Sequence, residues 1–599
     1  MAEVKKRAEM DPRYQWNTGD IFKTEADWEA ALEAARGFLP QLQALQGRLG
    51  ESGEQLAVYF RLSEQLRVAL GQVYCYANLR ADEDTAEAAG QERLARAQSL
   101  AVALSAADAF AAPEILAIPD DTLEGFYAAT PELERCRVAL DELRRRKAHV
   151  LSDREEALLA AAGEIAAGPY NVFSVFEGAD LKFPDAVDSE GNAHAVTNGG
   201  FATLLLSPDR TLRENAFRSF YAVWDGMRNT AGALLNAQHK QQQFFADARR
   251  YGSALEASLD GSNVPVAVYE NLLAAVDANL PKLHKYMALR KRLMGVDELH
   301  MYDLYTTLVP AADAKIPYAE AQSLVKSALS VLGEDYVAVL QRAFDEGWID
   351  VYENAGKRSG AYSCDVQGVH PYILLNQKDT LTSVFTLAHE LGHAMHSWLS
   401  DANQPVLYAD YVLFVAEVAS TVNEALLMHH LLERTTDRTE RAYLLNYFLE
   451  QFRTTIYRQT MFADFEKQCG DIVRQGGSLT AERLCALYLD LNRRYYGPAT
   501  TVDEAIGMEW ARIPHFYFNY YVFQYATGFS AAMAISQRIL KEGAAAVEDY
   551  RRFLSSGCSK SPIELLRIAG VDMTTAWPVN AALERFGELT DELDKLLEG

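Results

Sequence analysis

The sequence lacks three features that would narrow its class: closely spaced cysteines, a long apolar run and an excess of basic residues. Its six cysteines are scattered over 599 residues without a C-x-x-C pair. A chain of this size needs no disulfide framework, so this usage predicts reduced thiols in a reducing compartment. The most apolar windows, such as 97–112, are interrupted by Asp108, and no apolar stretch follows the charged N-terminus. We therefore expect no membrane-spanning helix, no signal peptide and a cytoplasmic location.

Acidic residues dominate the charge of the chain. The sequence has 83 Asp and Glu against 57 Lys and Arg, a formal net charge of -26. A field of this sign repels phosphates, which argues against nucleic acid or an anionic membrane as a partner. With 49% hydrophobic and 23% charged residues, the composition is that of a soluble globular protein. The length favours two or more lobes, and we find no internal repeat.

Most of the chain has a helical pattern. Thr24, with Asp27 three residues later, predicts a helix start, and Ala/Leu/Glu-rich sequence then continues to about residue 112. A second helical stretch covers about 131–167. The sequence therefore predicts a mainly α fold.

Two stretches depart from the helical pattern. Residues 168–200 carry β-branched and aromatic residues broken by a turn sequence, which predicts a small hairpin or a crossover. We place a domain boundary here, with a first domain over 1–190 and a second over 200–599. Residues 360–376 also have strand character, with an apolar end. From Ser383 onward the pattern predicts helices only.

The most informative stretch is 381–400, LTSVFTLAHELGHAMHSWLS. It contains the H-E-x-x-H pattern, whose histidines are His389 and His393. Apolar residues recur around the motif at helical spacing, which predicts a buried helix capped by Thr380 or the preceding aspartate. On such a helix the two imidazoles lie one turn apart on one face, where they can bind a single metal ion.

A third metal ligand is expected from a second helix. A catalytic zinc ion takes three protein ligands and keeps one position for water. The segment FVAEVASTVNEALLMHH supplies Glu417 and Glu424, seven residues apart and on one helical face. We assign Glu417 to the metal and Glu424 to the orientation of a ligand imidazole, with the reverse assignment as the alternative. Together with His389 and His393, this predicts one Zn²⁺ per chain.

The glutamate inside the motif, Glu390, has a different predicted role. Directed at the attacking water, it would accept a proton and pass it to the leaving amine of a cleaved peptide bond. The metzincin pattern requires Gly and a third His further along the helix, whereas this chain has His396 and Leu399 there. A ligand set of two His and one Glu is therefore expected.

An aromatic segment near the C-terminus is the third candidate. Five polar rings fall within eleven residues, namely His515, Tyr517, Tyr520, Tyr521 and Tyr525. Imidazole N–H and phenol O–H groups can donate to the oxyanion that develops during peptide hydrolysis. The alternative is that the aromatic residues form core, and we accept this for the phenylalanines of the segment.

Three segments, NQKDTLTSVFTLAHELGHAMHS, FVAEVASTVNE and RIPHFYFNYYVFQYATGFSAA, together resemble the oligoendopeptidase F branch of the M3 (thimet oligopeptidase-like) zinc metallopeptidases. The resemblance extends over most of the chain. It implies a complete site, made up of the zinc ligands His389, His393 and Glu417, the base Glu390, and the substrate-facing His515, Tyr517 and Tyr521.

The same resemblance implies a nearly all-helical fold of two lobes that flank a deep substrate channel, with a small sheet near the active site. Residues 360–376 are our candidate for that sheet. The first domain would be of the oligoendopeptidase F N-terminal type and the second an M3 catalytic domain. The channel would admit unstructured oligopeptides, whose backbone could bind in extended form against a strand edge.

The function we expect is hydrolysis of short peptides by a zinc endopeptidase. An exopeptidase is the nearer alternative, and it would need a cation for the substrate carboxylate, for which Lys357, Arg358 or Arg512 could serve. A catalytically silent peptide-binding protein is a second alternative. It is disfavoured because the base and all three predicted ligands are present.

Overall fold

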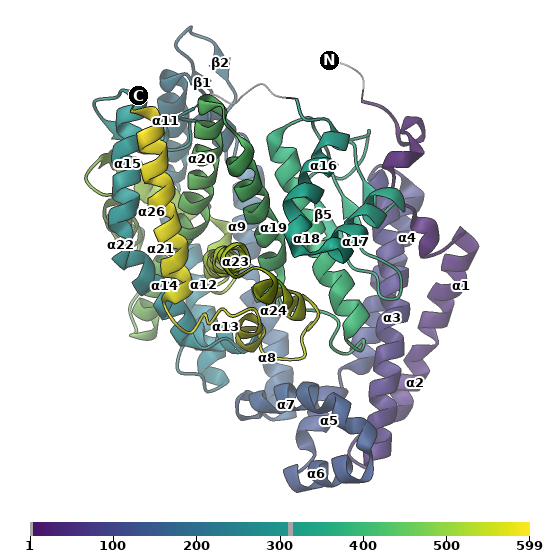
Figure 1. Cartoon of the computed structure of the whole chain (residues 1–599). Coiled ribbons are helices and arrows are strands. Elements are labelled where there is room, and N and C mark those ends of the chain that lie inside the picture. The colour runs from purple at the N-terminus through teal and green to yellow at the C-terminus, as the bar shows by residue number, and fades with distance from the viewer. Residues whose placement is uncertain (1–3, 310–314, 599) are drawn as a thin grey trace. The chain divides into compact units, whose positions relative to one another are not determined.

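The structure is a computed structural model that describes residues 4–309 and 315–598. It is 72% helical with 3% strand in small sheets, which confirms the predicted mainly α class. Figure 1 shows the helices and their order along the chain. The chain divides into two compact units, the first made of Met1–Ala148, Ala314–His429 and Ile535–Gly570, the second of His149–Asp313, His430–Ala534 and Val571–Gly599.

The first unit contains an N-terminal helical cluster and the helices of the H-E-x-x-H region. The cluster consists of α1 (Glu25–Arg36), α2 (Phe38–Leu45), α3 (Gly53–Glu83), α4 (Ala88–Asp108), α5 (Ala111–Ala117), α6 (Asp120–Ala129) and α7 (Arg137–Arg145). The remaining helices are α16 (Tyr318–Leu329), α17 (Glu334–Asp345), α18 (Leu381–Asn403), α19 (Leu413–Arg434), α24 (Ala544–Leu554) and α25 (Pro562–Ile568). Helix α19 ends in the second unit.

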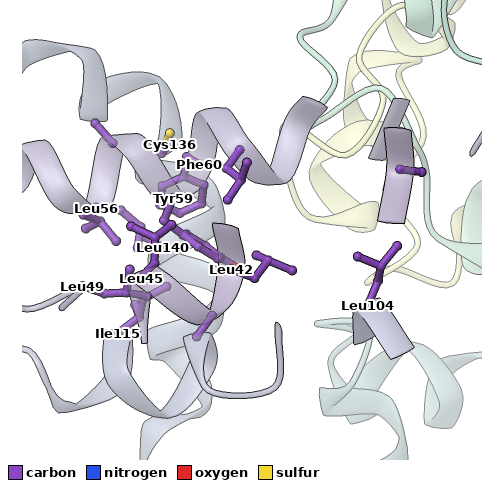
Figure 2. Packing of buried hydrophobic residues seen from close by; sticks show 14 of the residues in the cluster. Leu42, Leu45, Leu49, Leu56, Tyr59, Phe60, Leu104, Ile115, Cys136 and Leu140 are labelled. Atoms are coloured by element: carbon purple, nitrogen blue, oxygen red, sulfur yellow. The ribbon is translucent and has the colours of Figure 1, made fainter. Parts of the chain in front are cut away.

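The N-terminal cluster folds around its own apolar core. The Thr24 hydroxyl accepts the N–H of Asp27 at 3.2 Å, so the predicted start of α1 is confirmed. Trp28 and Leu32 on α1 are fully buried. Figure 2 shows leucines from α2 and the following loop in one buried cluster with Tyr59 and Phe60 of α3. The burial of these side chains provides the main driving force for this cluster.

Within the described residues, the stretch Ala88–Ala117 is long and apolar enough to cross a membrane by length and composition, with 28% of its apolar window buried. The sequence predicted no such stretch. In the structure Arg93 on α4 binds Glu25 at 2.8 and 2.6 Å, and Arg96 binds Glu29 at 2.6 and 2.5 Å. These ion pairs join α4 to α1 in the helical cluster. A cytoplasmic location stays a prediction.

A three-stranded sheet in the first unit has the order β4-β6-β5. The central strand β6 (Tyr372–Leu374) is fully buried, and it pairs in parallel with β4 (Ile349–Asp350) and antiparallel with β5 (Tyr362–Cys364). The predicted strand character of 360–376 is therefore confirmed. β4 was not predicted, because two residues are too few to show an alternating pattern. β5 lies at the edge of this sheet.

Two cysteines of the first unit are bonded to each other. Cys75 on α3 and Cys364 on β5 form a disulfide between positions 289 residues apart in the sequence. The prediction of six reduced thiols is wrong for this pair, because a contact at such separation leaves no local spacing pattern. The other four cysteines are free, two of them buried.

The second unit is built of helices with an aromatic core. They are α8 (Asp153–Ala166), α9 (Gly168–Val175), α10 (Phe201–Leu205), α11 (Arg210–Gly226), α12 (Arg228–Ala248), α13 (Ala254–Asp260), α14 (Val266–Ala278), α15 (Leu280–Met294), α20 (Arg438–Phe452), α21 (Arg458–Arg474), α22 (Ala481–Tyr496), α23 (Phe523–Glu542) and α26 (Trp577–Leu597). Helix α23 ends in the first unit.

Two short pairs of strands complete the second unit. The predicted hairpin is present as β1 (Ala186–Val187) antiparallel to β2 (Ala193–His194). The residues before it form α9 instead of a strand. Pro169 lies in the first turn of this helix, where proline is favoured, and Phe173 on the helix stacks on Tyr517. β3 (Leu299–His300) pairs with β7 (Thr500–Thr501). The expectation of helices only after Ser383 is therefore wrong at β7.

Candidate active site

Helix α18 carries the H-E-x-x-H motif. Its first turn is capped by Thr380, whose hydroxyl accepts the N–H of Ser383 at 3.3 Å, as one of the two predicted caps. The apolar face of the helix is buried, which fixes its rotation about its own axis. The rings of His389 and His393 consequently lie together, with centroids 4.8 Å apart.

Helix α19 lies directly against α18 at Gly392. A Cβ on Gly392 would stand 2.5 Å from Cα of Ser420 and 2.7 Å from the carbonyl oxygen of Ala419, so only glycine allows this approach. One turn away, Nδ2 of the fully buried Asn423 donates to the carbonyl of Ala388 at 3.0 Å. These two contacts fix the spacing of α18 and α19.

The close approach brings together three atoms that could hold a metal ion. Nε2 of His389 lies 3.2 Å from Nε2 of His393 and 3.3 Å from Oε2 of Glu417, and the remaining separation, between His393 and Glu417, is 3.6 Å. Tetrahedral zinc with ligands at 2.0–2.1 Å requires separations of about 3.3–3.4 Å. Among the described residues this is the one group of three His, Cys, Asp or Glu side chains close enough to hold a metal ion. The residues present therefore fit a zinc ion.

Glu424 lies on the other side of His389. Its Oε1 is 2.6 Å from Nδ1 of the imidazole, which leaves Nε2 facing Glu417. Burial lowers the pKa of His389, but hydrogen bonds with the two glutamates outweigh it and raise this pKa to about 10. Burial likewise raises the pKa of Glu417, yet the two imidazoles hold it below its usual range. The site is thus built to hold positive charge.

Glu390 is buried beside these groups. Its side chain has 6% relative exposure, and Oε2 has no hydrogen-bond partner in the described part of the chain. Burial raises the pKa of this carboxyl above its usual range, although the neighbouring imidazoles oppose the shift. A raised pKa makes a carboxylate a better proton acceptor. His396, by contrast, is buried and stacks on Tyr411 with ring centroids 3.7 Å apart, so it packs within the unit.

A cavity of about 430 Å³ lies where α18 begins. Thr386, which lines it, is three residues before His389 and so on the same helical face. Gly360 and Ala361, the two residues directly before β5, also line the cavity. The cavity thus lies between the residues that precede β5 and the first turns of α18, one turn before His389.

The aromatic segment belongs to the second unit. Oη of Tyr525 lies 3.3 Å from Nε2 of His515, and the rings of His515 and Tyr521 have centroids 6.1 Å apart. Tyr517 points differently, because its ring stacks on Phe173 at 4.5 Å and its side chain is buried. The structure therefore groups His515 with Tyr521 and Tyr525, whereas Tyr517 is buried against Phe173.

The three cations considered for a substrate carboxylate all have acidic partners. The buried ammonium of Lys357 lies 2.7 Å from Asp350. Arg358 pairs with Asp82 at 3.4 Å. Arg512 pairs with the buried Glu509 at 3.2 Å. Each of the three cations is thus engaged by an acidic side chain of the protein.

Two residues that shape the site, Gly392 and Asn423, were not predicted. Both lie inside the recognised motifs, and each is a poor choice for a buried helix on propensity alone. Such a residue inside a strongly apolar helix signals a close crossing or a satisfied polar contact. That signal could have identified both positions.

The chain resembles known peptidases over its whole length. Residues 203–585 match peptidase family M3, and residues 114–183 match oligopeptidase F. The chain is 43% identical to oligopeptidase PepF of Bacillus subtilis, a match that covers 100% of this chain and 90% of that protein. It is 38% identical to the group B oligopeptidase PepB of Streptococcus agalactiae, with 99% and 98% covered. The structure of oligoendopeptidase-F from Enterococcus faecium matches with a TM-score of 0.74 at 36% identity, covering 96% of this chain and 99% of that one.

Helical fold and histidine–glutamate site together define a metallopeptidase. The chain belongs to the oligopeptidase F branch of peptidase family M3. This confirms the predicted resemblance and the predicted class of enzyme, a metalloendopeptidase that hydrolyses peptide bonds. Membership implies a metal cofactor and peptide substrates.

Proposed function

We propose that the protein is a zinc endopeptidase that cleaves short, unstructured oligopeptides in the cytoplasm. The observation that carries the proposal is the spacing of the three donor atoms of His389, His393 and Glu417, at 3.2 to 3.6 Å from one another. Two imidazoles and one carboxylate suit a catalytic zinc ion, which keeps its fourth position for water. We assign one ion per chain to these residues.

The groups around the metal ligands divide the chemistry among them. When bound, zinc supplies Lewis-acid polarisation and lowers the pKa of water. Glu390 accepts the proton of the attacking water and returns it to the nitrogen of the leaving amine. Glu424 holds His389 through Nδ1, so that the lone pair of Nε2 is directed away from it.

The aromatic segment supplies hydrogen-bond donors to the substrate. We assign donation to the developing oxyanion to His515 and Tyr521, which lie together with Tyr525. Tyr517 is buried and stacks on Phe173, so we assign it a structural role in this segment. Burial lowers the pKa of His515, which favours the neutral imidazole with one N–H to donate.

Recognition of the peptide backbone is assigned to the edge strand β5 and the cavity beside it. Strand edges offer N–H and C=O groups at the spacing of an extended chain, and they place little demand on side-chain identity. A folded protein cannot present its backbone in this way. This mode of binding therefore suits short peptides of varied sequence.

An exopeptidase is the second candidate, and the structure offers little support for it. Such an enzyme needs an unpaired cation to hold the terminal carboxylate of its substrate. Lys357, Arg358 and Arg512 are each engaged by an aspartate or glutamate. Recruiting one of them would break an ion pair within the protein, and the partners Asp350 and Glu509 are buried.

The experiment combines metal analysis with a cleavage assay. The purified protein should contain about one zinc per chain. It should cut a peptide blocked at both ends as readily as the free peptide, and failure to cut the doubly blocked peptide would refute the endopeptidase assignment. Glu390→Gln should keep the metal and lose most of the hydrolysis, because the ligands are untouched while the proton acceptor is gone. Near-normal hydrolysis by that variant would remove Glu390 from the mechanism.

A further inference from the structure

A strained turn lies inside the aromatic segment. Asn519 and Tyr520 have consecutive φ values of 56° and 59°, in the left-handed region. Residues other than glycine seldom adopt this conformation, and a bulky aromatic residue is an outlier there. Such conformations persist where the surroundings over-determine them, and they gather at functional sites. Because Tyr521 follows directly, the conformation of this turn determines the position and direction of the Tyr521 side chain.

Glu466 on α21 holds this turn from within the protein. It is fully buried, and its Oε1 accepts the backbone N–H of Tyr520 at 2.7 Å. Oε2 has no hydrogen-bond partner in residues 4–309 and 315–598. Burial raises the pKa of this carboxyl to about 8, against the opposing hydrogen bond from Tyr520. The titratable side chains that interact with it, on Tyr269, Cys469 and Tyr520, are also kept neutral by burial.

Gly470, four residues after Glu466 on α21, contacts the same Asn519–Tyr520 segment. A Cβ on Gly470 would collide with Oη of Tyr520, so the phenol fits only because the residue is glycine. The ring of Tyr520 is itself 3% exposed. On the other side of the turn, the hydroxyl of Ser258 donates to the carbonyl of Asn519. The backbone and the ring of the turn are thus both fixed by buried neighbours.

We propose that Glu466 and Gly470 are positioning residues for peptide hydrolysis, because they seat the Asn519–Tyr520 turn and thereby place His515 and Tyr521. The inference rests on the proposed function of those two side chains. Neither Glu466 nor Gly470 touches the substrate. Misplacing a catalytic donor by about 1 Å can lower the rate by about 100-fold, so a substitution at Glu466 or Gly470 that shifts the turn should lower the rate of hydrolysis.

The test uses a pair of substitutions that should compensate for each other. Gly470→Ala introduces the methyl group that collides with Oη of Tyr520, and Tyr520→Phe removes that oxygen, leaving the nearest ring carbon at 3.2 Å. The full-length zinc enzyme and each variant are assayed for kcat and KM on a doubly blocked peptide, with zinc content and thermal unfolding measured in parallel. A phosphinic pseudopeptide counts the competent active sites. Gly163→Ala, where a Cβ meets no described atom within 4 Å, is the control for the same substitution.

We expect Gly470→Ala to lower kcat per titrated site by about 100-fold with zinc content and KM little changed. Tyr520→Phe in the same chain should restore most of that loss. Glu466→Gln should keep kcat within about threefold, since it reproduces the neutral acid and its acceptor oxygen, whereas Glu466→Ala should not. The inference is overturned if Gly470→Ala retains kcat, if its loss persists in the double variant, or if Glu466→Ala matches Glu466→Gln.

Two further variants separate this inference from the proposed function. Tyr521→Phe and His515→Ala are measured in the same assay. If both retain full kcat, the segment has no part in the chemistry and the proposed function is wrong on that point. If they lose kcat while Gly470→Ala does not, the donors stand and only the positioning inference falls.

Discussion

Substituting Gly392 by Ala tests whether the contact between α18 and α19 builds the metal site. The added Cβ would stand 2.5 Å from Cα of Ser420, where ordinary contact begins at 3.4 Å. The atoms in the way belong to the backbone of α19, so no side-chain rotation can relieve the clash. The helices must separate locally by about 1 Å.

The separation of the helices should weaken metal binding, because a zinc site tolerates only small changes in its ligand distances. Zinc ligands keep their distances within about 0.2 Å, so a 1 Å displacement of α19 moves Glu417 well outside that range. We expect zinc affinity to fall by at least about 100-fold, which corresponds to about 2.7 kcal/mol. The overpacking should cost about 1–3 kcal/mol of stability, partly offset by the higher helix propensity of alanine, about 1 kcal/mol.

The assay is competition for zinc against a chelator of known affinity, with thermal unfolding of the metal-free protein measured beside it. Gly71→Ala on α3 is the matched control, because it lies in a helix of the same unit where a Cβ meets no described atom within 4 Å. The control should keep its zinc affinity. If Gly392→Ala binds zinc as tightly as the wild type, the reasoning from the helix contact is refuted.

The remaining predictions concern three other residues. Glu424→Gln should weaken zinc binding by about 10–100-fold in the same competition assay, because His389 loses its charged hydrogen-bond partner; an unchanged affinity would deny Glu424 that role. Tyr521→Phe should lower kcat with little change in KM, as expected for a contact made in the transition state, and an unchanged kcat would move the role to another tyrosine. Glu466 is more basic folded than unfolded, so its contribution to stability is complete in acid and is lost as the pH rises towards about 8. Between about pH 5 and 8 this group should therefore lower the free energy of unfolding by up to about 1.4 kcal/mol per pH unit. Denaturant titrations should show a smaller decline in Glu466→Gln, which has no carboxyl to titrate. Parallel pH profiles for the two proteins would contradict this.

Local sequence predicted those parts of the fold that depend on neighbouring residues. The cap at Thr24, the cap at Thr380 and the strand character of 360–376 are all present. The helix α9 was missed because its aromatic and β-branched residues resemble a strand until their packing partners are known. The bond between Cys75 and Cys364 was missed for a similar reason, since it joins positions far apart in the chain.

The sequence by itself determined the class of the protein. A buried helix with His389 and His393 one turn apart, followed by a second helix with two glutamates, defines the chemistry through residue type and spacing. Only the tertiary structure decided which glutamate lies on which side of the imidazole. Glu417 and Glu424 share a helical face, so spacing cannot separate them, whereas Oε2 of Glu417 lies near both Nε2 atoms and Oε1 of Glu424 lies at Nδ1 of His389. The same holds for the turn at Asn519 and Tyr520, whose conformation is set by α21, about 50 residues earlier in the chain.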